Sequence, residues 1–459
     1  MGNFSSKITL HRFIYPALLG FAGILHAAGT TAVFDARDFG ATGDGTTLET
    51  VALNRAVEAC AKAGGGVVHV PAGRYLTGTV RLLSHVTLEI EAGAALLGSE
   101  NPDDYPDVAD PWEPHGTGHP ATAPLIYAED AENITITGRG TINGQGAIWW
   151  HRVRLNNPTK YPPGPRNDED RAEAAKLSKG RPNLIRLVRC DDVVIERVNL
   201  IDSPSWTVHP MFCKRLRIDG ISIKNPARMA HNTDGINPES CSNVQILNCR
   251  IDTGDDGITI KSGKNEPGRA MGLPCENITI ANCIIQNAHG GVTIGSEMSG
   301  GVRNVTVTNC VFQGTDNGIR LKTERGRGGV VEGIVVSNIV MQDVPTPFQM
   351  TMFYSKSADR FRAEPVTGTT PVFRDMLFSN ITARGAKTAG HIFGLAESPV
   401  EDVTFSNVHM NAAEGFEITH AHGITFLDSV IAVKSGPALV LKNTADVDQK
   451  RLIKREATP

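Results

Sequence analysis

The sequence lacks several features that would place it in common classes of protein. Lys plus Arg total 45 and Asp plus Glu total 49, a net charge of −4, so the basic excess that nucleic-acid binding needs is absent. No apolar run after the first 25 residues is long enough to cross a bilayer. We find no metal-ligand spacing and no glycine-rich phosphate loop, so we expect neither a metal ion nor a cofactor. Aromatic residues make up only 6%, which favours a core of Val, Ile and Ala.

The two ends of the chain differ from the rest. Residues 7–12 carry basic side chains, residues 13–25 are apolar, and small residues follow. This order is typical of a secretory signal, so we expect residues 1–28 to be a signal peptide and the protein to be secreted or periplasmic. Residues 446–459 are polar and charged, and we expect them to form a frayed tail.

A repeated frame, a cysteine followed by two alternating apolar residues, predicts the fold. Its four copies begin at Cys190, Cys213, Cys241 and Cys275. Their spacings of 23, 28 and 34 residues fit coils that bury their apolar faces only by stacking on one another. We therefore expect an all-β fold, a single-stranded right-handed parallel β-helix over residues 29–445. A helix at about residues 47–62, the one helix that the sequence clearly predicts, would cap its N-terminal end.

Two further positions of the frame repeat from coil to coil. Seven of the eight cysteines fall in two positions of the frame, where we expect them to be small core residues. Disulfide bonds between adjacent coils are the alternative that the sequence leaves open. Asparagine recurs at a third position: Asn248, Asn282, Asn309, Asn338, Asn380 and Asn407. We expect each asparagine to bond to the next at a turn.

Further along each coil the frame becomes polar and acidic. Asp255 and His289 lie fourteen residues after Cys241 and Cys275. Asp316 lies fourteen residues after Val302, which replaces the cysteine in a fifth copy of the frame, and Asp234 comes into phase with Asp256. Because stacked strands are about 4.8 Å apart, the carboxylates of Asp234, Asp255 and Asp256 should lie side by side. Like charges so close repel, so structure alone does not explain them, and we interpret them as a catalytic site. Asp316 fits a turn or the rim of the site.

Cations follow the acidic positions. Arg320 and Lys322 point the same way, one coil beyond His289. A planar guanidinium and an ammonium together suit a substrate that carries carboxylates. Lys261 could extend this basic patch or be ordinary surface, and Asn232 precedes the first aspartate; both are candidates for substrate binding.

In this order the motifs resemble glycoside hydrolase family 28, the polygalacturonases, whose pattern is Asn-Thr-Asp, Asp-Asp, Gly-His-Gly and Arg-x-Lys. The four motifs stand here at residues 232–234, 255–256, 288–290 and 320–322. Ala288 replaces the first glycine of the third motif. The stretch 290–297 resembles the bacterial branch, whose members often act on chain ends.

The resemblance implies a mechanism. Asp255 would be the general acid, Asp234 and Asp256 would hold the attacking water, and His289 would help to set their protonation. It also implies inversion at the anomeric carbon, for which acid and base are usually about 6.5–9.5 Å apart. The substrate would be an anionic, galacturonate-containing polysaccharide or oligosaccharide, cut by a monomer without a membrane span. The polar segments 103–124 and 152–179 could wall off the groove, which favours exo action.

Three alternatives stay open at this point. A rhamnogalacturonan or decorated-galacturonan hydrolase would share the site. A pectate lyase would share the β-helix but would use Ca²⁺ and a basic residue to eliminate rather than hydrolyse. A non-catalytic polysaccharide-binding β-helix would not need three crowded acids.

Overall fold

The computed structural model describes residue 2 and residues 32–456, except 111, 113–120, 161, 163, 228 and 355–361. The chain divides into two units, Met1–Thr31 and Ala32–Pro459, and only the second is considered below. The predicted signal peptide, residues 1–28, lies outside the described residues apart from Gly2. No helix among the described residues is long and apolar enough to cross a membrane.

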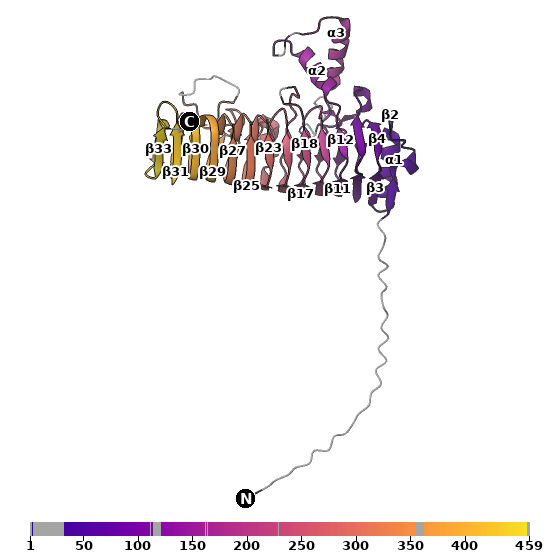
Figure 1. The fold of residues 1–459 in the computed structure, drawn as a ribbon, viewed down its shortest axis with the longest axis horizontal. Coiled ribbons are helices and arrows are strands. Elements are labelled where there is room, and N and C mark those ends of the chain that lie inside the picture. Colours follow the sequence, from indigo (N-terminus) through magenta and orange to yellow (C-terminus); the bar gives the residue numbers. More distant parts are fainter. Residues whose placement is uncertain are drawn as a thin grey trace. The chain divides into compact units, whose positions relative to one another are not determined.

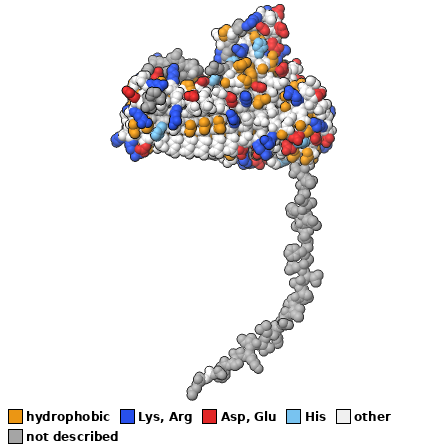
Figure 2. All heavy atoms as spheres, in the orientation of Figure 1, with side chains coloured by type: hydrophobic (Ala, Val, Ile, Leu, Met, Phe, Trp, Pro, Cys, Tyr) orange, Lys and Arg blue, Asp and Glu red, His pale blue; other side chains and the backbone are white. Residues whose placement is uncertain are grey.

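The described chain is a right-handed parallel β-helix, which confirms the predicted fold (Figure 1). Each coil contributes a strand to each of three faces in turn. In one coil these are β13 (Ile185–Val188), β14 (Asp191–Glu196) and β15 (Asn199–Ile201), after which β16 (Val208–Met211) pairs in parallel with β13. We call the face that contains β13 and β16 the site face. Acidic and basic side chains are interspersed over the surface seen in Figure 2, in keeping with the small net charge.

The strands fall into these three faces as follows. The site face also contains β5 (Val80–Arg81), β10 (Ile126–Glu129), β21 (Ile258–Ile260), β24 (Gly290–Gly295), β26 (Asn317–Lys322) and β28 (Thr346–Thr351). The second face contains β14 with β1 (Val33–Asp35), β3 (Gly66–Val70), β6 (Val86–Ile90), β11 (Glu132–Gly138), β17 (Lys214–Asp219), β19 (Ser242–Leu247) and β22 (Cys275–Ala281). The third face contains β15 with β2 (Asp44–Leu48), β4 (Gly73–Thr77), β7 (Ala94–Gly98), β12 (Thr141–Asn143), β18 (Ser222–Lys224), β20 (Arg250–Asp252), β23 (Ile284–Gln286), β31 (Ser429–Val433) and β33 (Leu452–Glu456). The strands that turn corners between faces are β25 (Val302–Gln313), β27 (Val330–Gln342), β29 (Val372–Phe393), β30 (Val400–Leu427) and β32 (Leu439–Asp448).

Helix α1 (Thr50–Lys62) lies where the sequence predicts a cap, although it begins three residues later. Its buried face, which includes Leu53, Val57 and Cys60, belongs to the same core as the first coils. The helix therefore covers apolar surface that no preceding coil covers.

Three more helices show that the expectation of a single helix is wrong. Helices α2 (Ala147–Asn156) and α3 (Asp168–Ala175) occupy a long insertion between β12 and β13 and stand out from the solenoid (Figure 1). Helix α4 (Asn265–Met271) follows β21. The apolar side chains of α2 are spread around the helix, so its sequence shows no single apolar face. A start signal is visible for α3, because Asn167 caps its N-terminus and acids fill its first turn.

The repeated core positions behave as expected. All eight cysteines are buried and unpaired, so they are core residues and not disulfides. The asparagine ladder bonds from coil to coil; Asn309 Nδ2, for example, lies 3.5 Å from Asn282 Oδ1, and Asn338 Nδ2 lies 3.2 Å from Asn309 Oδ1. Each of these asparagines has φ near +55°, a left-handed conformation that asparagine tolerates better than most residues.

The expectation that the C-terminal segment is a frayed tail is wrong for its described residues. Strand β32 ends at Asp448, and β33 pairs in parallel with β31 along its whole length. Residues 446–456 therefore continue the solenoid, and only residues 457–459 lie outside the described part.

Candidate active site

The three predicted acids come together at the corner where the third face turns into the site face. Gly235 N donates to Asp256 O at 2.9 Å, and His289 N donates to Asp255 O at 3.0 Å, so the coils stack in the predicted register. One oxygen from each of Asp234, Asp255 and Asp256 lies within 4.8 Å of the others. The sequence prediction of an acidic cluster is therefore matched by the geometry.

Asp256 is the most deeply placed of the three acids, with a side chain only 1% exposed. Lys322 Nζ lies 2.7 Å from its Oδ2, and Arg320 Nη1 lies 3.2 Å from its Oδ1. Burial alone would raise the pKa of Asp256, but these two cations outweigh burial and hold it well below its ordinary value. Asp256 therefore stays ionised as a carboxylate. Gly290 faces it closely, since a Cβ there would lie 2.8 Å from Asp256 Oδ1.

Asp234 is also buried, with a side chain 6% exposed. Among the described residues its ion-pair partner is Lys261, whose Nζ lies 4.0 Å from Asp234 Oδ2 but only 2.9 Å from Glu297 Oε2. Burial, and after it the charge of Asp255, hold the pKa of Asp234 well above its ordinary value. Asp234 therefore keeps its proton at a pH where a surface carboxyl has lost its own.

Asp255 is the most accessible acid of the cluster, with a side chain 18% exposed. His289 is half-exposed beside it, with Nδ1 3.2 Å from Asp255 Oδ1. The hydrogen bond to Asp255 raises the pKa of His289 above its ordinary value. Asp255 and His289 thus form the part of the cluster that a substrate can touch.

One expectation about spacing does not hold. We expected the acid and the base to be separated as in most inverting glycosidases, at about 6.5–9.5 Å. The nearest oxygens of the three carboxylates lie within 4.8 Å of one another, because they come from neighbouring coils and adjacent residues. Separation alone therefore does not support inversion here.

The four candidate substrate-binding residues lie around the cluster and differ in their burial and in their bonding partners. Both cations of the Arg-x-Lys motif are committed to Asp256, and Arg320 Nε also donates to Gln349 Oε1 at 2.9 Å. Lys261 is buried, paired with Glu297, and 4.8 Å above the ring of Trp206. Asn232 is exposed, and its Oδ1 accepts from Arg181 Nη2 at 2.8 Å. Asp316 is exposed at a turn, as we expected for the rim.

Sequence reasoning missed two further residues at the site. Tyr354 is 43% exposed, and its ring centre lies 5.0 Å from Lys322 Nζ. It belongs to an insertion after β28, where the repeat gives no register. Glu297 ends the stretch that resembles the bacterial branch, and it holds Lys261 beside Asp234. A buried lysine needs a carboxylate partner, but the sequence alone does not say which one.

The acidic cluster is the one group of His, Cys, Asp or Glu side chains in the described residues that is compact enough to hold a metal ion. Both oxygens of Asp256 already face cations of the protein. The arrangement is therefore suited to proton transfer and to holding a water.

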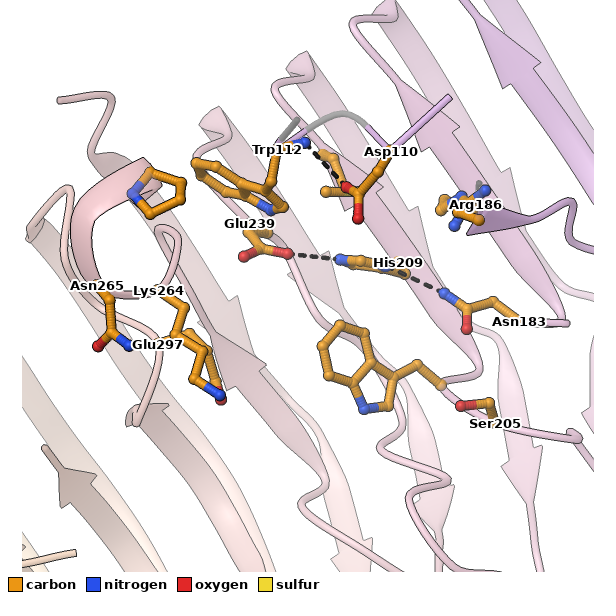
Figure 3. A pocket seen from close by; sticks show the side chains of 14 residues that line it. Asp110, Trp112, Asn183, Arg186, Ser205, His209, Glu239, Lys264, Asn265 and Glu297 are labelled. Atoms are coloured by element: carbon orange, nitrogen blue, oxygen red, sulfur yellow. Dashed lines mark hydrogen bonds and ion pairs between the residues drawn. The ribbon is translucent and has the colours of Figure 1, made fainter. Parts of the chain in front are cut away.

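The site face also has a cavity of about 620 Å³ (Figure 3). It is lined by Asp110, Trp112, Ala121, Asn183, Arg186, Ser205, Trp206, His209, Met211, Glu239, Lys264, Asn265, Pro267 and Glu297. The short antiparallel pair β8 (Asp107–Val108) and β9 (Ala121–Thr122) belongs to an insertion between β7 and β10. Trp112 from this insertion packs against Phe212 at the end of β16, with ring centres 4.8 Å apart. The insertion therefore reaches over the site face on the N-terminal side of the acids.

Comparisons with known proteins agree with this geometry. The sequence matches the glycosyl hydrolases family 28 over residues 68–429, and residues 33–90 also match the rhamnogalacturonase A/epimerase, pectate lyase-like family. A probable polygalacturonase from Vitis vinifera is 36% identical over 385 residues, which cover 82% of this chain and 74% of the relative. An endo-polygalacturonase from Pectobacterium carotovorum subsp. carotovorum is 30% identical over 389 residues, covering 81% of this chain and 87% of the relative.

Among solved structures, an exopolygalacturonase from Thermotoga maritima superposes with a TM-score of 0.70 and 32% identity, over 91% of this chain and 92% of that chain. The relatives thus include enzymes that cut within chains and enzymes that cut at their ends. The family match extends over most of the solenoid, including all four motifs of the acidic corner. This chain therefore belongs to glycosyl hydrolases family 28 and is a glycoside hydrolase.

Proposed function

We propose that the protein is an exo-acting polygalacturonase, which hydrolyses the galacturonosidic bond at the end of a pectin chain. The observation that carries the proposal is a corner where Asp234, whose raised pKa keeps it protonated, and the accessible Asp255 lie beside the ionised carboxylate of Asp256. Hydrolysis of a glycoside needs both a proton donor and an ionised base. The relatives named as polygalacturonases supply the substrate class.

In this mechanism Asp255 is the general acid. It is the most accessible acid of the cluster, and it lies beside Asp234 and Asp256. It protonates the leaving oxygen, while His289 supports it through the bond at Nδ1. Asp234 and Asp256 together orient the attacking water.

Burial supports inversion where the carboxylate spacing does not. A retaining enzyme needs a carboxylate that reaches the anomeric carbon and bonds to it. Asp256 is held by two cations, and both Asp256 and Asp234 are almost fully buried. Such carboxylates reach the sugar through a water molecule, and a water attacking from the side opposite to the leaving group inverts the configuration.

Exo action is supported by the insertion that carries β8 and β9. Trp112 and Ala121 line the cavity on the N-terminal side of the acids, so a chain lying along the site face would meet this insertion. The expected wall at residues 103–124 corresponds to this insertion, although much of it lies outside the described residues. The second expected wall, residues 152–179, contains part of α2 and all of α3.

The protein would act as a secreted or periplasmic monomer. Pectin is a polymer too large to enter a cell intact, and the first 28 residues have the pattern of a secretory signal. Both statements can be checked with the same preparation, by sequencing the mature N-terminus and by measuring the mass in solution.

A product time course on polygalacturonic acid tests the proposal. We expect one short product from the first minutes, with slow loss of viscosity, and proton NMR should show the inverted anomer first. A spread of oligomers would contradict exo action, and the retained anomer would contradict the water-mediated route. Equal or greater activity on rhamnogalacturonan would contradict the substrate assignment.

A further inference from the structure

The cavity of Figure 3 contains a buried cation that has no carboxylate partner among the described residues. Arg186 in β13 is 8% exposed, and in that part of the chain no carboxylate oxygen lies within 4.0 Å of its guanidinium. Its Nη2 donates to the backbone oxygen of Thr122 at 3.3 Å, and its Nε has no hydrogen-bond partner there. A buried charge without a partner costs several kcal/mol, so an anion bound in this cavity would recover part of that cost.

The polar neighbours of Arg186 do not serve as that anion. Asn183 Nδ2 donates to His209 Nδ1 at 3.1 Å, which leaves the proton of the neutral ring on Nε2, and Nε2 donates to Glu239 Oε2 at 2.8 Å. Burial lowers the pKa of His209 and so favours this neutral ring. Glu239 Oε1 accepts from Gly263 N at 3.2 Å. Figure 3 shows this chain of bonds crossing the floor of the cavity, with each member already satisfied.

The charges at the rim of the cavity nearly balance. Asp110, from the covering insertion, lines the cavity, and its Oδ1 accepts from Trp112 N at 3.0 Å. Lys264 is an exposed cation that also lines it. The two other lining acids are bonded elsewhere, Glu239 to His209 and Glu297 to Lys261. The cavity therefore offers a buried guanidinium and an exposed ammonium to an anion.

Aromatic side chains supply the remaining surface. Trp206 packs its edge against His209, with ring centres 4.6 Å apart, and Trp112 lies on the other side of the cavity. Broad apolar ring faces are suited to the C–H face of a sugar. A ligand with one carboxylate and one apolar sugar face matches this combination of groups, and a uronate residue has both.

The lining of the cavity lies close to the catalytic acids. Thr207, which follows Trp206, donates its backbone N to Asp234 O at 2.9 Å. Glu297 lines the cavity and pairs with Lys261, which lies 4.0 Å from Asp234. A chain that binds at the acids could therefore place its end in the cavity.

We propose that this cavity binds the terminal uronate of the substrate chain and that Arg186 grips its carboxylate, so that the enzyme selects chain ends with a free acid. Arg186 would be a specificity-determining residue that contacts substrate away from the reacting atoms. The inference rests on the proposed function, because it assumes that a galacturonan chain occupies the site face.

The test uses trigalacturonates that carry a single methyl ester on one or the other terminal sugar, with kcat and KM measured for each. For the unmodified protein we expect esterification of one end to reduce kcat/KM by about 30-fold, the size of one charge-assisted hydrogen bond. In Arg186→Gln this discrimination should fall below about threefold, mainly through a higher KM for the free acid. Arg250→Gln on the third face is the matched control, since its side chain is exposed and bonds to Gln286, far from the cavity lining.

Arg186→Lys is the second variant, in case removal of the buried charge prevents folding. It keeps the charge but loses the planar fork, so it should retain only part of the discrimination. Folded Arg186→Gln or Arg186→Lys that discriminates as well as the unmodified protein would overturn the inference. Failure of the proposed function would look different, because the unmodified protein would then release no reducing ends from polygalacturonic acid.

Discussion

The turn between the second and third faces stacks neutral asparagines on one another, whereas the acidic corner of the site face stacks ionisable carboxyl groups. At the turn between the second and third faces, Asn309 lies between Asn282 and Asn338. Its side-chain amide donates one hydrogen bond to Asn282 and accepts one from Asn338. At the acidic corner the same coil spacing brings Asp234 beside Asp256, and their charges would repel. Two cations on Asp256 and a retained proton at Asp234 relieve this repulsion. One repeat therefore gives a stable ladder where residues are neutral and a reactive site where they are ionised.

The largest effect is expected when the general acid, Asp255, is removed from the acidic corner. We expect Asp255→Asn to lower kcat by roughly 10³-fold or more, because general acid catalysis contributes about 10²–10⁴-fold. The amide keeps the size of the side chain, so the fold and weak oligogalacturonide binding should remain. Kinetics with circular dichroism check this, and a near-native kcat would show that Asp255 is not the acid.

The second largest effect is expected on stability, when one of the two cations that bind Asp256 is removed. Lys322→Met leaves that carboxylate buried with only Arg320, and breaking a buried pair costs about 3–5 kcal/mol of unfolding free energy. Adding Asp256→Asn to this variant should restore part of the lost stability but not the activity. Urea unfolding of the two single variants and the double variant measures the coupling. Equal stability of Lys322→Met and the unmodified protein would contradict the ion pair.

The third prediction sharpens the comparison through pH. The raised pKa of Asp234 keeps a proton on this carboxyl, so activity should fall when Asp234 loses that proton as pH rises and adds a negative charge to the site of an anionic substrate. Glu297→Gln removes the competing partner of Lys261, whose charge then acts more fully on Asp234 and lowers its pKa. The alkaline limb of the rate profile should therefore move to lower pH, by roughly one unit.

Rate profiles of kcat/KM between acidic and mildly alkaline pH measure this shift. The unmodified enzyme should have an acidic to neutral optimum. Glu276→Gln is a suitable control, because Glu276 pairs with Arg303 on the second face. An unchanged alkaline limb in Glu297→Gln would show that Lys261 does not act on Asp234.

The smallest effect is expected on the ladder. Asn309→Ala removes two side-chain hydrogen bonds. It also puts an alanine, which has no polar side chain to stabilise a left-handed backbone, at a φ of +56°. Together these changes should lower the free energy of unfolding by about 1–2 kcal/mol. Asn309→Gly keeps the left-handed backbone easy to adopt and isolates the loss of the bonds. Thermal unfolding of both variants gives the two contributions. A larger loss for glycine than for alanine would mean that backbone strain is not involved.

Features that repeat along the chain can be predicted from the sequence. Cys190 and its equivalents define the frame, and the frame by itself puts Asp234, Asp255, Asp256 and His289 in register. Features that do not repeat cannot be predicted in this way. Helix α2 lacks an apolar face, and Arg186 and Trp112 line one cavity only because an insertion folds back over the site face.

Ion pairing at the site is also beyond sequence reasoning. Arg320 and Lys322 were expected to face the substrate, whereas both bind Asp256. A sequence shows which cations are near the acids but not which carboxylate they choose, because that choice depends on side-chain conformation and burial.

The insertions before β10 and β13 leave and rejoin the solenoid at one corner, between the third face and the site face. Their lengths can therefore change without altering the rise from one coil to the next, which is what holds the acids at their distances. A lineage built on this scaffold could pass between trimming polymer tips and severing polymers internally by lengthening or shortening these excursions alone. Such a change would leave the hydrolytic chemistry untouched.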